Sequence, residues 1–201
     1  QSCRDCHAEA FNLWQSSHHA LAERALDPVV DRAAFDPPRS FNHGSQTSEA
    51  RMTNGQFQIV TLGPGGKRDA SAAERVIGVA PLRQFLVPER GGRLQVTELA
   101  FDPGRSDWFD IFGNEDRQPG EWGHWTGRGM NWNMMCAGCH NTRVRKNYQA
   151  QTDSYATALA ERGVGCEACH GPLAQHVAWQ RKRSSGPTEL QKSNDPTVPR
   201  L

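Results

Sequence analysis

All six cysteines of the chain lie in three copies of one pattern, in which two cysteines separated by two residues are followed at once by a histidine. The copies are Cys3-Arg4-Asp5-Cys6-His7, Cys136-Ala137-Gly138-Cys139-His140 and Cys166-Glu167-Ala168-Cys169-His170. This C-x-x-C-H pattern is typical of c-type haem attachment. Two thiols three residues apart lie on one side of a helical turn, where they can form thioethers with the two haem vinyl groups. The pattern therefore predicts three covalently bound haems.

Zinc sites and disulfides are the alternative uses of paired cysteines. The second and third pairs have 26 residues between them, a spacing that a zinc ribbon tolerates. Zinc gives no reason for a histidine after every pair, and it leaves the first pair without partners. With eight histidines in 201 residues, chance places one after all three pairs roughly 6 times in 100,000. Disulfides suit the even number of cysteines but ignore the histidines, so we favour haem attachment.

The motif histidines His7, His140 and His170 are the predicted proximal iron ligands. A second ligand on each iron decides between electron transfer and catalysis, because an open position is what lets a haem bind a small molecule. Five candidate distal histidines remain: His18, His19, His43, His124 and His176. Methionine is the other option, and three methionines lie near the second motif: Met130, Met134 and Met135. Five histidines for three irons favour bis-histidine ligation, with the methionines as packing residues.

The spacing of these histidines limits which of them can share an iron. Two axial nitrogens lie about 4 Å apart, since each metal–imidazole bond is about 2.0 Å. On one helix His7 and His19 are about 18 Å apart, which excludes a shared iron. His170 and His176 are about 9 Å apart on a helix and are also poorly placed. We therefore expect each iron to join different chain segments, which would tie the fold together through its metals.

The composition fits a small exported protein that carries apolar cofactors. The chain has 201 residues, 36% of them apolar, with a mean hydropathy of −0.72 and a formal charge of +1. Haem macrocycles would add apolar surface to this sparse core, and roughly six propionates would make the holoprotein acidic. There is no sustained basic stripe for nucleic acid and no run of about 18 apolar residues for a membrane span. Since haem is attached to such motifs outside the cytoplasm, we expect a periplasmic or extracellular protein whose signal peptide has been removed.

Helices are predicted in four segments. Apolar residues near one face predict a helix over residues 8–26, ended by Asp27-Pro28. Helices are also predicted at 129–140 and 153–163. Pro172 is placed to start a last helix, which we expect to end at about residue 181.

Between the first and second motifs the pattern changes to strands. Asn54-Gly55 and Gly91-Gly92 each separate two short β-prone runs, which predicts two hairpins. We therefore expect a mainly α and irregular multihaem cytochrome c fold with a small antiparallel β insertion at about 48–102. The whole chain, 1–201, is predicted to form one trihaem domain, with a linker or tail over 184–201.

Several longer blocks resemble the cytochrome c-554 type multihaem family, in particular the bacterial branch that carries tetratricopeptide repeats further along. The blocks are WQSSHHAL (14–21), GVAPLRQFL (78–86), HWTG (124–127), NWNMMCAGCHNT (131–142), GCEACHGP (165–172) and HVAW (176–179). The resemblance implies soluble electron carriers of the periplasm or cell exterior. It also implies His19, His124 and His176 as distal ligands. His18 would replace His19 after a slight helix rotation, and His43 has no place in the family's pattern.

These observations predict an electron carrier rather than an enzyme: three haems that move single electrons between redox partner proteins. One alternative is a haem enzyme with an open iron that acts on a small nitrogen or sulfur compound, with Arg143, Arg145 and Lys146 as a candidate anion site. Another is a polymeric filament, in which His18 or His43 ligates a haem of the next subunit. Relatives in the resembling branch usually continue with more haem motifs, so we expect a fragment, a trimmed product or a minimal version of a longer protein.

Overall fold

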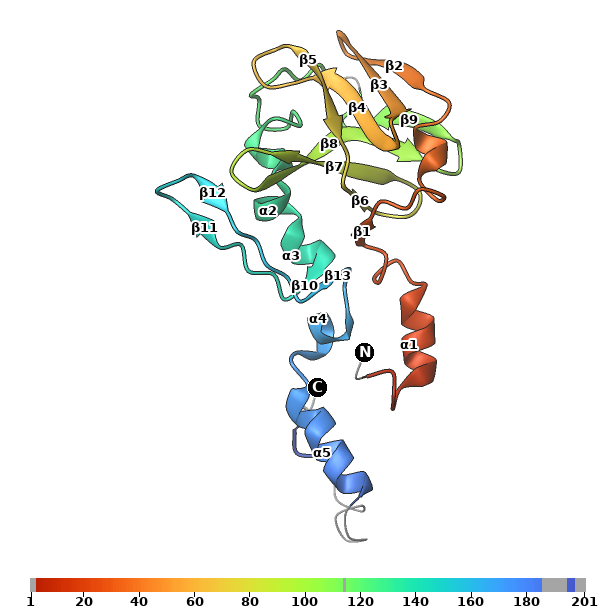
Figure 1. Cartoon of the computed structure of the whole chain (residues 1–201), viewed down its shortest axis with the longest axis vertical. Helices are drawn as coiled ribbons and strands as arrows, with labels where there is room; N and C mark the ends of the chain where they lie inside the picture. Colours follow the sequence, from red (N-terminus) through yellow and green to blue (C-terminus); the bar gives the residue numbers. More distant parts are fainter. Residues whose placement is uncertain (1–2, 114, 186–194, 198–201) are drawn as a thin grey trace.

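The computed structural model describes residues 3–113, 115–185 and 195–197. A β-rich unit occupies one end of the molecule, and the segments that carry the cysteine pairs extend from it toward the other end (Figure 1). Strands make up 35% of the described residues and helices 21%. The expectation of a mainly α fold is therefore wrong. None of the described helices is long and apolar enough to cross a membrane.

A four-stranded antiparallel sheet forms one layer of the β-rich unit. Its strands, in spatial order, are β2 (Arg39–His43), β3 (Gln46–Thr53), β4 (Gln56–Leu62) and β5 (Arg68–Ala72). The predicted turn at Asn54-Gly55 is confirmed: both residues have positive φ, and Thr53 pairs with Gln56. Such a two-residue turn matches the twist of the strands that it joins.

A five-stranded antiparallel sheet forms the second layer. Its strands, in spatial order, are β1 (Glu23–Ala25), β6 (Arg75–Ile77), β7 (Arg83–Glu89), β8 (Arg93–Asp102) and β9 (Asp107–Asp110). The predicted hairpin at Gly91-Gly92 is confirmed as the β7–β8 connection. An apolar cluster contains residues from both sheets, with Phe57 and Ile59 from β4 beside Phe85 and Leu99 from β7 and β8.

The fold-class prediction is wrong because the edge strands and the short inner strand β6 carry little β signal. The residue pattern predicts the central strands β3, β4, β7 and β8. It does not predict the edges β1, β2, β5 and β9, which are short and rich in charged side chains. Edge strands are commonly short and charged, because this discourages pairing with other chains. The β-rich unit therefore extends well beyond the expected range of 48–102.

The helices are short, and most of them contain or flank a cysteine motif. They are α1 (Ala8–Gln15), η1 (Arg32–Ala34), η2 (Arg128–Met130), α2 (Trp132–Met135), α3 (Ala137–His140), α4 (Cys166–His170) and α5 (Ala174–Ser184). Two small ladders lie among them, β10 (Asn141–Thr142) with β13 (Glu161–Arg162), and β11 (Tyr148–Gln149) with β12 (Ser154–Tyr155). The predicted last helix is confirmed as α5, with slightly later bounds.

One of the other helix predictions is wrong, and two are correct in part. The helix predicted at 8–26 ends at Gln15, because the Ser17 hydroxyl accepts the Ala20 amide N–H in a turn and the chain then enters β1. The helix predicted at 153–163 is replaced by β12 and β13. The helix predicted at 129–140 is broken into η2, α2 and α3. In β1 and β13, pairing with the distant strands β6 and β10 outweighs local helical propensity.

Candidate functional site

The second cysteine motif occupies α3 and the turn before it. The amide N–H of His140 bonds the carbonyl of Cys136 at 3.2 Å, so the two thiols lie on one helical turn. Burial, followed by the charge of Glu23, raises the pKa of the Cys136 thiol to about 11. The Nδ1 of His140 lies 3.2 Å from the carbonyl oxygen of Ala22. Since a carbonyl only accepts, Nδ1 carries the proton and Nε2 is left with a lone pair for a metal.

Glu23 joins the second motif to the β-rich unit. Its carboxylate is fully buried and accepts from the Trp132 indole and the Asn141 amide, each at 2.6 Å. Arg75 donates to its other oxygen at 3.2 Å. Trp132 precedes the motif and Asn141 directly follows His140, so one carboxylate accepts hydrogen bonds from residues on both sides of the motif. Glu23 could not be identified from the sequence, because a glutamate inside a predicted helix gives no signal of burial.

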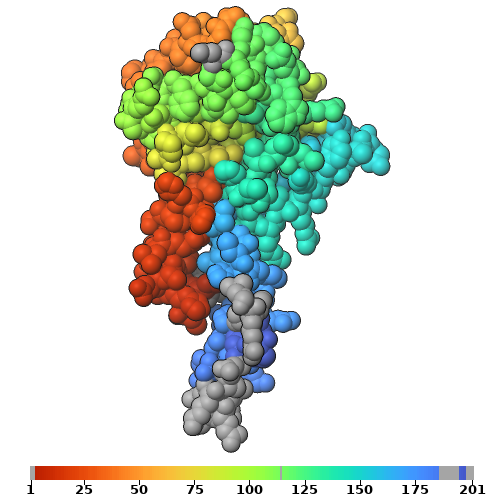
Figure 2. Space-filling view, turned by 180° about the vertical axis from the view of Figure 1, so that it is seen from behind, coloured from red at the N-terminus to blue at the C-terminus, as the bar shows by residue number. Residues whose placement is uncertain are grey.

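The first motif and α5 bring two histidines together. The ring centroids of His7 and His176 are 6.3 Å apart, and their planes differ by 22°. Two axial imidazoles on one iron have centroids about 6.2 Å apart, from two bonds of about 2.0 Å and about 1.1 Å from each nitrogen to its ring centre. Figure 2 shows the N-terminal segment beside the C-terminal segments, below the β-rich unit. The separation of these two rings therefore matches that of two axial imidazoles on one iron.

The turn after α1 lies against the segment that leads to the third motif. The Trp14 indole donates to the carbonyl of Val164 at 2.8 Å, and the Val164 amide donates to the carbonyl of His19 at 2.8 Å. A Cβ on Gly163 would lie 2.2 Å from the carbonyl oxygen of Ala20, so only glycine allows this approach. The side chain of His19 is exposed beside these contacts. The first and third motifs are therefore neighbours.

The third motif also contacts the first and second motifs through side chains. Burial and the adjacent Cys3 thiol raise the pKa of the Cys166 thiol. Arg143, just beyond the second motif, lies 3.3 Å from Glu167 of the third motif. His170 is exposed at the end of α4. All three motifs thus form one continuous region, in which the third lies between the other two.

His124 has a different setting from His140. It is fully buried in the β-rich unit, where the Thr126 amide donates to its Nδ1 at 3.2 Å. The proton of the neutral ring therefore lies on Nε2, which is 3.7 Å from a carboxylate oxygen of Glu98. Burial lowers the pKa of His124 to about 4 and raises the pKa of Glu98 to about 7. Ligation by His124 would require this tautomer and this enclosure to change.

His43 is also buried in the β-rich unit, and His18 is exposed near the first motif. The Nε2 of His43 lies 2.7 Å from the Ser48 hydroxyl, and its Nδ1 lies 3.4 Å from Asp110. This burial leaves His43 poorly placed to reach a neighbouring subunit. Among the described residues, no group of three or more histidines, cysteines or carboxylates is arranged to hold a metal ion.

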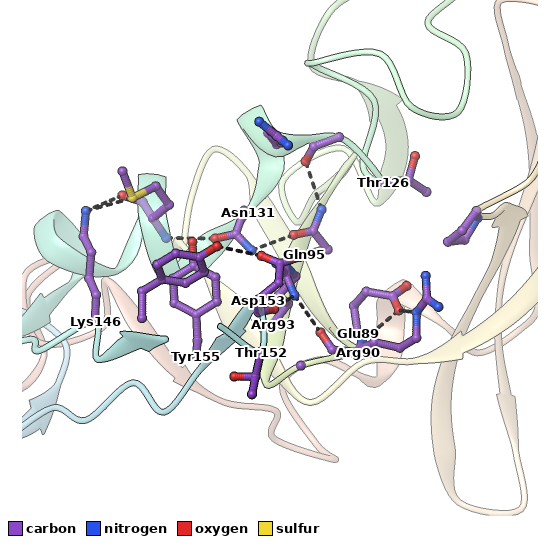
Figure 3. A pocket seen from close by; sticks show the side chains of 16 residues that line it. Glu89, Arg90, Arg93, Gln95, Thr126, Asn131, Lys146, Thr152, Asp153 and Tyr155 are labelled. Atoms are coloured by element: carbon purple, nitrogen blue, oxygen red, sulfur yellow. Dashed lines mark hydrogen bonds and ion pairs between the residues drawn. The ribbon is translucent and has the colours of Figure 1, made fainter. Parts of the chain in front are cut away.

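A cavity of about 950 Å³ lies between the β7–β8 turn, the β11–β12 hairpin and the loop before α2 (Figure 3). Of the predicted anion-site residues, Lys146 lines it, whereas Arg143 and Arg145 do not. Arg93, on the same wall, pairs with Asp153 at 2.5 Å. None of the described residues that line the cavity belongs to a cysteine motif. The cavity therefore contains none of the histidines that are predicted to hold an iron, although Met134 lines it.

The family assignment follows from comparison with known proteins. The model of the family described as "Cytochrome c554 and c-prime" matches residues 2–56 and 123–171, just over half of the chain. The chain belongs to this family. The resemblance to multihaem c-type cytochromes is thereby confirmed.

One solved structure shares the fold of this cytochrome. It is the undecaheme cytochrome from the S-layer of Carboxydothermus ferrireducens, with a TM-score of 0.52 and 19% sequence identity. The match covers 88% of the cytochrome and 21% of that chain, so the cytochrome spans about a fifth of its length. A comparison with curated proteins gave no significant match.

Proposed function

We propose that the cytochrome is an electron relay with three covalently attached c-type haems that pass single electrons between redox partner proteins. Each haem supplies a reversible one-electron iron centre when bound. The three C-x-x-C-H motifs form one continuous region of the fold, which supports one trihaem unit formed by the whole chain. We further propose a periplasmic or extracellular location, because haem is attached to these motifs outside the cytoplasm.

The first haem is proposed to have His7 and His176 as its axial ligands. The single observation that carries this proposal is the 6.3 Å separation of the two ring centroids, which matches the spacing of two imidazoles on one iron. Both iron positions would then be filled. A filled sixth position supports electron transfer rather than substrate binding.

The second and third haems are proposed to have His140 and His170 as proximal ligands. The contact of His140 Nδ1 with the Ala22 carbonyl supports iron binding through Nε2. His19 is the favoured distal ligand for one of these two haems, because its exposed side chain follows α1 and its backbone contacts the segment before the third motif. His124 remains the family-based candidate for the other haem, and His18 the substitute for His19.

Replacement of the distal histidines tests this scheme. We expect His176→Ala and His19→Ala each to convert one of three haems from low to high spin, with the haem-to-protein ratio unchanged at three. Optical and EPR spectra of the oxidised protein measure the spin state, and a haem assay on denatured protein measures the ratio. His18→Ala is the matched control, with three low-spin haems expected. A ratio below three would refute the haem count, and unchanged spin in His176→Ala would refute the first axial pair.

A further inference from the structure

Asp195 lies directly beside the predicted distal ligand of the first haem. One carboxylate oxygen is 2.6 Å from the Nδ1 of His176, and both side chains are largely buried, at 10% and 18% exposure. Because a carboxylate only accepts, the imidazole proton lies on Nδ1 and the lone pair lies on Nε2. This is the tautomer that a metal needs from a histidine that binds through Nε2.

Further hydrogen bonds hold the Asp195 carboxylate in place. The Thr197 amide donates to its second oxygen at 2.8 Å, and the Thr197 hydroxyl donates to the same oxygen. Gln180, one helical turn after His176 on α5, donates to the first oxygen at 3.2 Å. Both oxygens therefore have partners, and the carboxylate cannot rotate away from the imidazole without breaking them. Part of the predicted tail over 184–201 thus contacts the first haem region, while 186–194 and 198–201 lie outside the described residues.

The partner of His176 differs in charge from the partner of His140. The Nδ1 of His140 donates to a neutral backbone carbonyl at 3.2 Å, whereas the Nδ1 of His176 faces a carboxylate at 2.6 Å. Hydrogen bonds to ionised acceptors are shorter and roughly twice as strong as neutral ones. A carboxylate partner also raises the basicity of a metal-bound imidazole. A more basic ligand stabilises ferric iron more than ferrous iron.

We infer that Asp195 is a positioning residue that fixes the tautomer and ring plane of His176 and lowers the reduction potential of the haem held by His7 and His176. The inference rests on the proposed axial pair. The histidine His140 donates to a neutral peptide carbonyl instead, so this hydrogen bond lowers the reduction potential of its haem less.

Asp195→Asn tests the inference, because it removes the charge while it keeps the size of the side chain. Outer-shell partners typically change metal affinity by roughly 10–100-fold. A tenfold loss of preference for ferric iron corresponds to a rise of about 59 mV in a one-electron potential. We expect one of three potentials in an optical redox titration to rise by about this amount, and one low-spin EPR signal to shift as the His176 plane changes.

Thr197→Val is the matched control, because it removes a hydrogen bond to Asp195 but keeps the carboxylate and its contact with His176. We expect it to leave all three potentials within about a quarter of the Asp195→Asn shift. An equal shift in Thr197→Val, or unchanged potentials and EPR signals in Asp195→Asn, would overturn the inference. Three low-spin haems in His176→Ala would instead refute the axial pair itself, so the two failures are distinguishable.

Discussion

The β-rich unit and the segments that carry the cysteine motifs are stabilised in different ways. In the β-rich unit, large side chains such as Phe35, Phe85 and Phe101 are completely buried between two sheets. By contrast, α1, α4 and α5 contain no buried residue. These helices are held by individual hydrogen bonds, such as the one from Trp14 to Val164. The difference indicates that the β-rich unit folds by burying its own apolar surface, to which the segment of the second motif adds Trp132 and Ala137. The segments of the first and third motifs, in contrast, depend on haem for apolar burial.

Removal of the haems is expected to have the largest effect and to separate the two regions. In a chain with all six cysteines replaced by alanine, α1, α4 and α5 should exchange amide hydrogens at least about tenfold faster than in the holoprotein. Strands β7 and β8 should keep most of their protection, because Phe85, Leu99 and Phe101 belong to an apolar cluster that contains no motif residue. Cys136 of the second motif packs against the other cluster that β7 and β8 share. Hydrogen exchange with mass spectrometry measures both. Equal loss of protection in both regions would contradict the conclusion that the β-rich unit is stable without haem whereas α1, α4 and α5 are not.

Phe35→Ala is expected to destabilise the β-rich unit without changing the haems. Phe35 is fully buried and contacts the rings of Phe57, Phe85 and Trp108. Removal of a buried phenylalanine costs roughly 3–5 kcal/mol of unfolding free energy, which urea titration of the β-rich unit would measure. The haem spectra should stay unchanged below the transition. Phe109→Ala, at a side chain with 39% exposure, is the control with a small expected effect.

Glu23→Ala is expected to affect both regions at once, because Glu23 connects them. Its loss leaves Arg75, the Trp132 indole and the Asn141 amide without their buried acceptor. Breaking a buried charge pair typically costs roughly 3 kcal/mol or somewhat more. We expect lower stability in urea together with a shifted spectrum of the haem on the second motif. Glu74→Ala, at an exposed glutamate nearby, should change neither, and a normal haem spectrum in Glu23→Ala would argue against the link.

The buried Glu98–His124 pair is expected to have the smallest effect in the unsubstituted protein. It makes the free energy of unfolding depend on pH through two contributions of opposite sign. The pKa of Glu98 is raised from 4.5 to about 7, so the folded protein binds its proton more tightly than the unfolded chain does. Its contribution to stability is therefore present at low pH and falls as the pH rises from about 4.5 to 7. The pKa of His124 is lowered from 6.5 to about 4, so its contribution rises over about pH 4 to 6.5.

Glu98→Gln separates these two contributions. If the His124 ring is not bound to iron, the stability of the variant, measured by urea titration between pH 4 and 7.5, should rise with pH by roughly 3 kcal/mol, because only the His124 part remains. In the unsubstituted protein the two parts should largely cancel. A flat profile in Glu98→Gln would indicate that the His124 ring cannot take up a proton, as expected if it binds iron.

The cofactor chemistry and the central hairpins could be predicted from the sequence because both are local. Thioether attachment needs only two thiols on one helical turn and the histidine after them. The turns at Asn54-Gly55 and Gly91-Gly92 depend on residues that adopt positive φ. Each signal lies within a few residues, where backbone geometry alone relates sequence to structure.

The partners of each histidine and the extent of the sheets were decided only by the tertiary structure. The Ala22 carbonyl lies 118 residues from His140, and His7 meets a ring on α5 near the other end of the chain. The buried state of Glu23 likewise depends on pairing of β1 with β6. These contacts form because distant strands and helices pack together, and no local pattern of residue types records that packing.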